Sequence, residues 1–199
     1  MCTLVVAARV VPGFPLVVVA NRDEQLDRAS SPPLWWSGPP RFIAPRDEVA
    51  GGTWLGLNEA GVFVAITNRF LGPRDASRVS RGALVVDALR GASAREVHAA
   101  MSKLDPALYN GFHLVYADER DVLATVSDGR ELAQVALGDG LSIVTERSFG
   151  AGSHGDGDGR RVQKIEAAWA KLTANGARLD PARATSLLAE HDDADRLGA

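Results

Sequence analysis

Two long apolar runs near the start of the chain limit the possible folds most strongly. Residues 3–11 (TLVVAARVV) and 16–21 (LVVVAN) are rich in valine and have the length of strands, and PGFP at residues 12–15 separates them. Valine favours strands, and proline with glycine favours turns, so this pattern predicts a β-hairpin. Both runs are almost continuously apolar rather than alternating, which indicates strands that are covered on both faces.

The size and charge of the chain narrow the class of protein. Its 199 residues suit one domain, over residues 1–199, and its net charge of −3 gives no large basic surface for nucleic acid. A single cysteine argues against a disulfide framework and against CxxC metal sites. No apolar run reaches the roughly 18 residues of a membrane span, and no signal-peptide pattern is evident at the start. We expect a cytoplasmic protein with no membrane span, no metal and no cofactor; the oligomeric state is left open.

The remaining helix and strand patterns are segregated along the chain. We expect an irregular segment at residues 25–42, further strands at 42–70 and two helices at 80–104. A meander of strands at 112–146 and two final helices at 160–191 should follow. The second helix should begin at a capping box formed by Ser93 and Glu96, and the last helix at Asp180 followed by Pro181. This order predicts an α+β fold, a four-layer α-β-β-α sandwich of antiparallel sheets.

The turn at residues 12–15 sets which residues of the hairpin face each other. A four-residue turn pairs residues whose numbers sum to about 27. Cys2 would then lie opposite Gln25, within one or two places of NRDE at residues 21–24. We therefore expect the hairpin to bring Arg22 and two carboxylates to the N-terminal cysteine.

Such a set of residues has a chemical use if Met1 is removed. Cys2 would then carry an α-amine of its own, which can act as the base for its thiol. Arg22 would favour the thiolate, and Asp23 could hold the α-ammonium in place. The thiolate would attack the acyl carbon of an amide or thioester. Asn68, at the end of a strand, is the candidate donor to the resulting oxyanion.

An alternative interpretation of the same residues involves no catalysis. A lone cysteine near the start of a chain is usually inert, and an Arg-Asp pair after a strand is usually a surface ion pair. Trp35, Trp36 and Trp54, which lie in Pro-, Ser- and Gly-rich segments, could line an apolar pocket for an acyl chain or a porphyrin, or they could pack in the core. The glycines of GGTWLG at residues 51–56 are expected to let the backbone approach closely at Gly51 and Gly52. The candidate substrate contacts are Asn21, Glu24, Trp35, Trp36, Gly52, Thr53 and Trp54.

Several motifs together resemble one family. The chain resembles the NRDE family, also called the transport and Golgi organisation protein 2 family. The resemblance rests on MC at the start, PLVVVANRDE, the WW pair, AGGTWLGLNEAGVFVAITNR and SRGALV. The resemblance runs to about Gly91. It implies the fold of the N-terminal-nucleophile hydrolases, with bacterial members similar to penicillin and bile-salt acylases. It also implies that Cys2 is the nucleophile position, supported by Arg22 and Asp23, and that Asn68 matches the acylase oxyanion asparagine by approximate position.

The chain departs from the family pattern in two places. VTERSFG stands where an LSN-like stretch is expected, and it puts Glu146 near the place of an acylase asparagine. A carboxylate donates to an oxyanion only when it is protonated, so the role of Glu146 is open. Family members usually continue with closing strands that contain a YGTRSS-like motif, whereas this sequence ends at Ala199. The predicted sandwich could therefore lack its last strands, which would leave a sheet edge open.

Two hypotheses about function follow. The preferred one is an N-terminal-cysteine hydrolase that cleaves a linear amide or thioester of a small hydrophobic molecule. The alternative is a non-catalytic protein that binds or carries haem or an acyl lipid in the same pocket, as the family's links to haem mobilisation and to lipid or acyl-CoA homeostasis imply. The expected partner is a small hydrophobic acyl substrate or haem.

Overall fold

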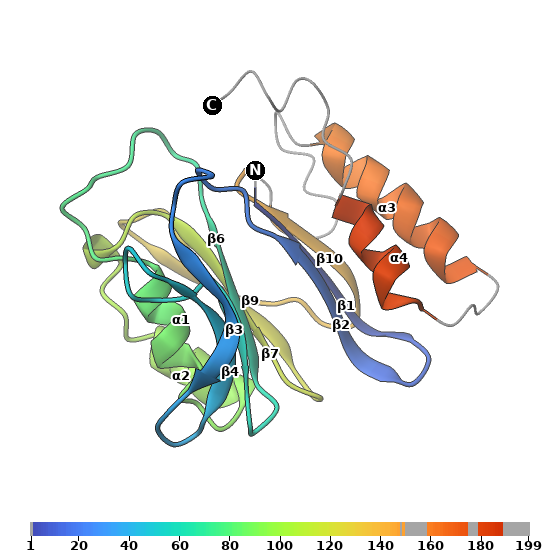
Figure 1. Cartoon of the computed structure of the whole chain (residues 1–199), viewed down its shortest axis with the longest axis horizontal. Coiled ribbons are helices and arrows are strands. Elements are labelled where there is room, and N and C mark those ends of the chain that lie inside the picture. The colour runs from blue at the N-terminus through green and yellow to red at the C-terminus, as the bar shows by residue number, and fades with distance from the viewer. Residues whose placement is uncertain (1, 148, 150–158, 175–178, 189–199) are drawn as a thin grey trace. The chain divides into compact units, whose positions relative to one another are not determined.

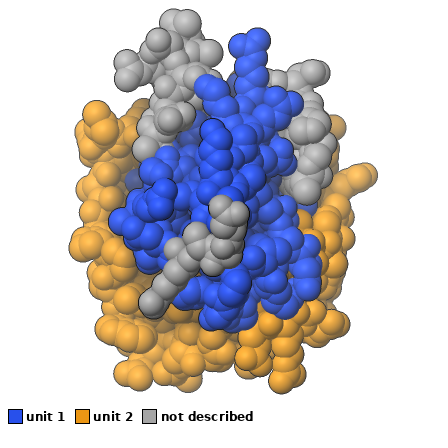
Figure 2. All heavy atoms as spheres, turned by 90° about the vertical axis from the view of Figure 1, so that its right-hand side faces the viewer, with its two compact units in different colours: residues 1–23, 139–199 blue, residues 24–138 orange. Residues whose placement is uncertain are grey.

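The computed structural model describes residues 2–147, 149, 159–174 and 179–188 (Figure 1). The chain divides into two compact units, which Figure 2 shows in different colours. Unit 1 comprises residues 1–23 and 139–199, and unit 2 comprises residues 24–138. Each unit has its own antiparallel sheet and its own hydrophobic core. The α+β class is thereby confirmed, whereas the single domain over residues 1–199 stays a prediction.

The sheet of unit 1 contains the predicted hairpin. Its strands are β1 (Thr3–Val11), β2 (Phe14–Asn21) and β10 (Gly140–Thr145), and β1 lies between the other two. Both pairings are antiparallel. The chain therefore enters this sheet at its start, leaves it after Asn21 and returns to it more than a hundred residues later to pair with β1.

The register of the hairpin differs from the prediction by three residues. Thr3 faces Asn21, whereas the predicted register would have placed Glu24 opposite Thr3. The turn has two residues, Pro12 and Gly13, because Gly13 adopts a positive φ of 82° that a tight hairpin turn requires and that glycine takes without strain. The second strand therefore begins at Phe14, inside the predicted turn, which accounts for two of the three positions, and a bulge in β1 between Ala8 and Val11 accounts for the third. The observed register brings NRDE closer to Cys2 than expected.

Helices cover one face of this sheet (Figure 1). They are α3 (Gly159–Thr173), α4 (Pro181–Thr185) and the short 3-10 helix η3 (Ser186–Leu188). As predicted, α4 begins with Asp180 as N-cap, whose Oδ1 accepts a hydrogen bond of 2.9 Å from the N–H of Ala182. The core of unit 1 is formed by Val5, Ala7, Val11, Val19, Ile143, Val162, Ile165, Trp169, Leu179, Ala184, Leu187 and Leu188.

The sheet of unit 2 has seven strands that follow one another in chain order. They are β3 (Ser30–Trp36), β4 (Phe42–Asp47), β5 (Leu55–Asn58), β6 (Phe63–Asn68), β7 (Phe112–Ala117), β8 (Val122–Ser127) and β9 (Leu132–Ala136). The helices α1 (Gly82–Ala88) and α2 (Ala94–Met101) lie against one face (Figure 1), and the 3-10 helix η1 (Pro106–Leu108) leads into β7. The N-cap half of the predicted capping box is present, because Ser93 Oγ accepts from the N–H of Glu96, whereas the Glu96 carboxylate accepts from the N–H of Ala92.

Two expectations about unit 2 are wrong. Residues 30–36 form a strand rather than an irregular segment, and Pro32 and Pro33 are tolerated there because β3 is an edge strand with one neighbour. The strands after residue 112 do not form one meander, because β10 leaves for the other sheet. Among the described residues, no helix is both long enough and apolar enough to cross a membrane.

Candidate active site

The candidate site of unit 1 is built on the open end of the β1–β2 hairpin. Cys2 comes directly before β1, and Asp23 follows β2 by two residues. The Sγ atom of Cys2 accepts a hydrogen bond from the backbone N–H of Asp23 at 3.3 Å, and it lies 3.5 Å from the backbone oxygen of Asp23, to which a thiol S–H can donate. The N–H stabilises an anionic sulfur as well as a neutral one. The backbone of Asp23 therefore holds the sulfur in place in either protonation state.

The side chain of Asn21 ties the two strand ends together. Its Oδ1 accepts from the backbone N–H of Thr3 at 2.9 Å, and its Nδ2 donates to Asp23 Oδ1 at 2.8 Å. The amide thus fixes the first residue of β1 and the carboxylate of Asp23 at once. Asn21 thus positions both groups, and its predicted contact with substrate stays a prediction.

A buried arginine from α3 joins the same hydrogen-bonded set. The Nε of Arg161 donates to Oγ1 of Thr3 at 3.0 Å, and both residues are buried. Thr3 also faces Thr145 of β10 in the sheet. Our sequence analysis missed Arg161, although one signal was present: it stands four residues before Ile165 and so continues the buried stripe of α3.

The other two residues of NRDE have different surroundings. Arg22 is half-buried between Asn21 and Asp23. Glu24 belongs to unit 2, where its Oε2 lies 3.6 Å from Arg28 Nε in an ion pair. Its predicted contact with substrate stays a prediction, as does the support that Arg22 would give to the thiolate.

Asn68 lies in unit 2, at the end of β6, where it is exposed and faces Phe112. Its predicted role as the oxyanion donor stays a prediction. The preceding Thr67 is buried, and its Oγ1 lies 3.2 Å from Nδ1 of His113. This contact satisfies a ring nitrogen of His113 within the sheet of unit 2.

The tryptophans of unit 2 have different surroundings. Trp35 is 62% exposed, and the guanidinium of Arg41 lies 5.5 Å from the centre of its ring. Trp36 is half-buried and stacks on Phe42 with ring centres 5.3 Å apart, which is core packing. Trp54 is half-buried. Only Trp35 offers most of its side chain to a ligand among these three.

The predicted close approach of the backbone at Gly52 is confirmed. A Cβ atom at this position would lie 2.5 Å from the carbonyl carbon of Gly82, at the start of α1. The next residue, Thr53, is buried, and its N–H donates to the Gly82 oxygen at 3.3 Å. Gly51 takes a positive φ of 75° in the preceding turn. Apart from its chain neighbours, no atom of the described residues would come within 4 Å of a Cβ at Gly51, so the close approach predicted there is wrong. Gly52 alone lets α1 pack against this segment, and the proposed substrate contacts of Gly52 and Thr53 stay predictions.

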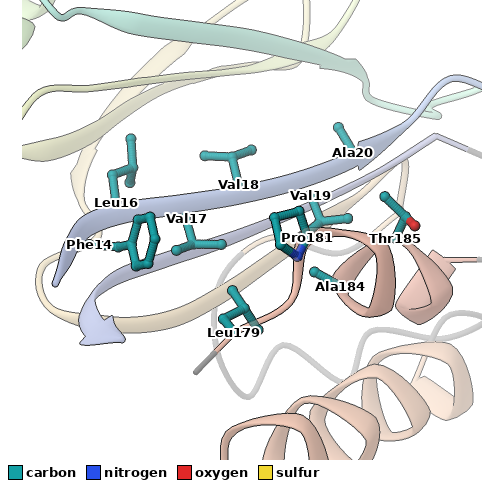
Figure 3. A pocket seen from close by; sticks show the side chains of 10 residues that line it. All are labelled: Phe14, Leu16, Val17, Val18, Val19, Ala20, Leu179, Pro181, Ala184 and Thr185. Atoms are coloured by element: carbon teal, nitrogen blue, oxygen red, sulfur yellow. The ribbon is translucent and has the colours of Figure 1, made fainter. Parts of the chain in front are cut away.

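An apolar groove runs along β2 in unit 1 (Figure 3). Its volume is about 420 Å³, within the range of small-molecule sites. Figure 3 shows Phe14 at one end and Ala20 with Thr185 at the other. Ala20 immediately precedes Asn21, so the groove leads along the strand toward the residues that hold Cys2. The lining residues are Phe14, Leu16, Val17, Val18, Val19, Ala20, Leu179, Pro181, Ala184 and Thr185.

Two further observations bear on the chemistry. Glu146 directly follows Thr145, the last residue of β10, which faces Thr3 in the sheet, and the chain bends at Glu146. In the part of the chain that the structure describes, no three His, Cys, Asp or Glu side chains are grouped to hold a metal ion. The hydrogen bonds between Cys2 Sγ and the backbone of Asp23 make this set of residues a positioned thiol.

Comparison with known proteins connects this geometry to a family. The family model described as Transport and Golgi organisation 2 matches residues 1–195. The Transport and Golgi organization 2 homolog of Mus musculus is 33% identical over 109 residues, which are 53% of this chain and 39% of that protein. The homolog of Bos taurus is 30% identical over 135 residues, which are 64% of this chain and 49% of that protein. The chain thus spans less than half the length of these relatives.

Two solved structures share the fold. The Caenorhabditis elegans N-acylethanolamine-hydrolyzing acid amidase ortholog matches with a TM-score of 0.70 at 13% identity, over 95% of this chain and 86% of that chain. The mutant C2A conjugated bile acid hydrolase from Clostridium perfringens matches with a TM-score of 0.62 at 11% identity, over 95% and 78%. The predicted fold of the N-terminal-nucleophile hydrolases is confirmed. At these identities the likeness concerns the fold alone.

Proposed function

Because the chain belongs to the Transport and Golgi organisation 2 family and has an N-terminal-nucleophile hydrolase fold, we propose that it is an N-terminal-cysteine hydrolase. Its substrate would be a linear amide or thioester of a small hydrophobic molecule. The observation that carries the proposal is the hydrogen bond from the Asp23 N–H to Cys2 Sγ, which fixes a thiol at the N-terminal end of a strand.

The proposed reaction begins after removal of Met1. The α-amine of Cys2 takes the thiol proton, and the sulfur attacks the acyl carbon to form a tetrahedral intermediate. The Asp23 carboxylate, which Asn21 orients, accepts a hydrogen bond from the α-ammonium. The amine or thiol of the substrate leaves with the proton from the α-ammonium. Water then hydrolyses the thioester between Cys2 and the acyl group, which releases the carboxylic acid and restores the thiol.

The negative oxygen of the intermediate needs a donor. Asn68 is our candidate, because its side-chain amide can donate and because it matches the acylase asparagine by approximate position. Glu146 follows the last residue of β10, and its backbone N–H is able to donate, whereas its ionised side chain is not. The role of Asn68 is the part of the proposal that depends most on the family resemblance.

The apolar part of the substrate has a candidate place on the same strand. The groove along β2 has one polar side chain, Thr185, among its lining residues, and Thr185 lies at the end near Ala20. Burial of a hydrocarbon chain there would be favourable by about 0.8 kcal/mol for each CH₂ group. This supports a substrate with an uncharged apolar chain attached to the scissile carbonyl.

An acyl thioester with a terminal alkyne tests the proposal. We expect the wild-type protein to form a covalent acyl adduct on Cys2, and Cys2→Ala to form none. Cys2→Ser should form an oxygen ester more slowly or not at all, since serine is the weaker nucleophile. The hydrolysis rate should fall at least about 10³-fold in Cys2→Ala.

The same experiment separates an enzyme from a carrier. The groove could also hold an acyl chain without any turnover. If the wild type and Cys2→Ala bind an acyl lipid or haem equally well and neither hydrolyses a thioester or amide, the carrier hypothesis replaces the enzyme hypothesis.

A further inference from the structure

A buried cation lies beneath the candidate site. Arg161 on α3 is only 8% exposed, whereas the neighbouring Arg160 is exposed. Burial of a guanidinium costs several kcal/mol unless hydrogen bonds compensate for the lost water. Packing alone therefore does not explain why an arginine is buried at this position.

The hydrogen bonds of Arg161 lead to the cysteine in short steps. Its Nε donates to Thr3 Oγ1 at 3.0 Å, and the Thr3 N–H donates to Asn21 Oδ1 at 2.9 Å. Asn21 holds Asp23, and the Asp23 N–H donates to Cys2 Sγ. Thr3 is also the residue that directly follows Cys2. Thr3 is thus connected to Cys2 directly through the chain and to Asp23 through the two hydrogen bonds of the Asn21 side chain.

We propose that Arg161 is a positioning residue of the Cys2 site. By fixing the side chain of Thr3, it holds the N-terminal end of β1 in register with Asn21, so that Sγ stays within reach of the Asp23 N–H. Its charge also favours anionic sulfur nearby, because a cation stabilises a thiolate through a medium of low polarity. This inference rests on the proposed function, because it concerns the same thiol.

The single cysteine of the chain gives a direct readout. Alkylation by iodoacetamide reports Cys2 alone, and the rate across a pH range from about 5 to 9 reports the thiolate. Arg161→Met keeps the long apolar stem and removes the charge and the donors. We expect alkylation at neutral pH to slow about tenfold, as a shift of one unit in the titration of the thiol would produce.

Two variants serve as comparisons. Arg160→Met removes a neighbouring exposed guanidinium and should alkylate like the wild type. Arg161→Lys keeps the charge and one donor and should restore part of the rate. A folded Arg161→Met protein with the wild-type rate and pH profile, or one that merely melts at a lower temperature, would overturn the proposal.

Thr3→Val covers the case in which Arg161→Met does not fold. It removes the hydroxyl acceptor and keeps the shape of the side chain, and it should slow alkylation in the same direction. An unchanged rate in Thr3→Val would also overturn the proposal. Alkylation does not depend on turnover: if the wild type hydrolyses nothing but Arg161→Met still slows alkylation, the proposed function fails and the positioning role stands.

Discussion

The backbone N–H of Asp23 donates a hydrogen bond to Sγ of Cys2 at 3.3 Å, although 21 positions separate the two residues in the sequence. The hairpin makes this contact possible, because Thr3 faces Asn21 and the strand ends therefore meet. The thiol is consequently held by main-chain atoms, whose position depends on the register of two strands rather than on a flexible side chain.

Replacement of Asn21 should loosen this arrangement. Asn21→Ala removes the hydrogen bonds to the Thr3 N–H and to Asp23 Oδ1. We expect acylation of Cys2 to slow about 10- to 100-fold, because small displacements of a nucleophile are costly. Gln25→Ala removes an exposed amide of similar type nearby and should have no effect. Equal acylation rates in the two variants would show that Asn21 does not position the site.

Replacement of Asn68 tests the oxyanion donor. Asn68→Asp keeps the shape of the side chain but removes its ability to donate when ionised. We expect kcat to fall about 10²- to 10³-fold with little change in KM, since the lost interaction forms only in the transition state. Steady-state kinetics with a thioester substrate measure both constants. An unchanged kcat would remove Asn68 from the mechanism.

The groove along β2 should select long acyl chains. Phe14 is 45% exposed and lies at the end of the groove away from Ala20 (Figure 3). In Phe14→Ser, kcat/KM should fall about tenfold for a long-chain thioester and remain nearly constant for an acetyl thioester. Val49→Ser changes a valine that is 65% exposed in unit 2 and serves as the control. Equal losses for both chain lengths would contradict this use of the groove.

The stability of the protein should decrease in mild acid because of His98. Its Nδ1 lies 2.6 Å from Oη of Tyr116, and burial, together with the charge of Arg95, lowers the pKa of His98. The folded state therefore binds fewer protons than the unfolded chain, whose histidine titrates at about 6.5. The free energy of unfolding should fall as the pH drops from about 6.5 through the lower folded pKa.

Urea unfolding at pH values from about 7.5 to 5 measures this effect. His98→Gln cannot take up the proton and should show a weaker dependence on pH than the wild type. Carboxylates contribute to both proteins, so the difference between the two curves isolates His98. Identical slopes would mean that the protonation of His98 does not oppose folding.

The hairpin could be predicted because its signal is local. Valine-rich runs and a Pro-Gly turn fall within 20 residues, and Asp23, whose backbone N–H donates to Cys2 Sγ, follows two residues after the second strand. The exact register could not be predicted, because it depends on the backbone conformation of single residues. The positive φ of Gly13 allows a two-residue turn, which shifts the register by two positions, and a bulge between Ala8 and Val11, where Arg9 has a positive φ, shifts it by one more.

The rest of the site depends on contacts between distant segments. Arg161 is 158 positions away from Thr3 in the sequence. The strands of the seven-stranded sheet all lie between β1 and β10 in the sequence, although β1 and β10 pair. Periodicity shows that α3 has a buried face, but it does not show which strand that face meets. The family resemblance supplied the nucleophile position, and it carried no information on Arg161.

The intact mass of the purified wild-type protein, recorded before and after a brief incubation with an acyl thioester, tests the central claim most directly. We predict that the protein has lost Met1 and that one acyl group becomes attached to the N-terminal peptide that begins at Cys2, and that this adduct is absent from Cys2→Ala. Uniform retention of Met1, or an unchanged protein mass together with an unhydrolysed thioester, would contradict an N-terminal-cysteine hydrolase.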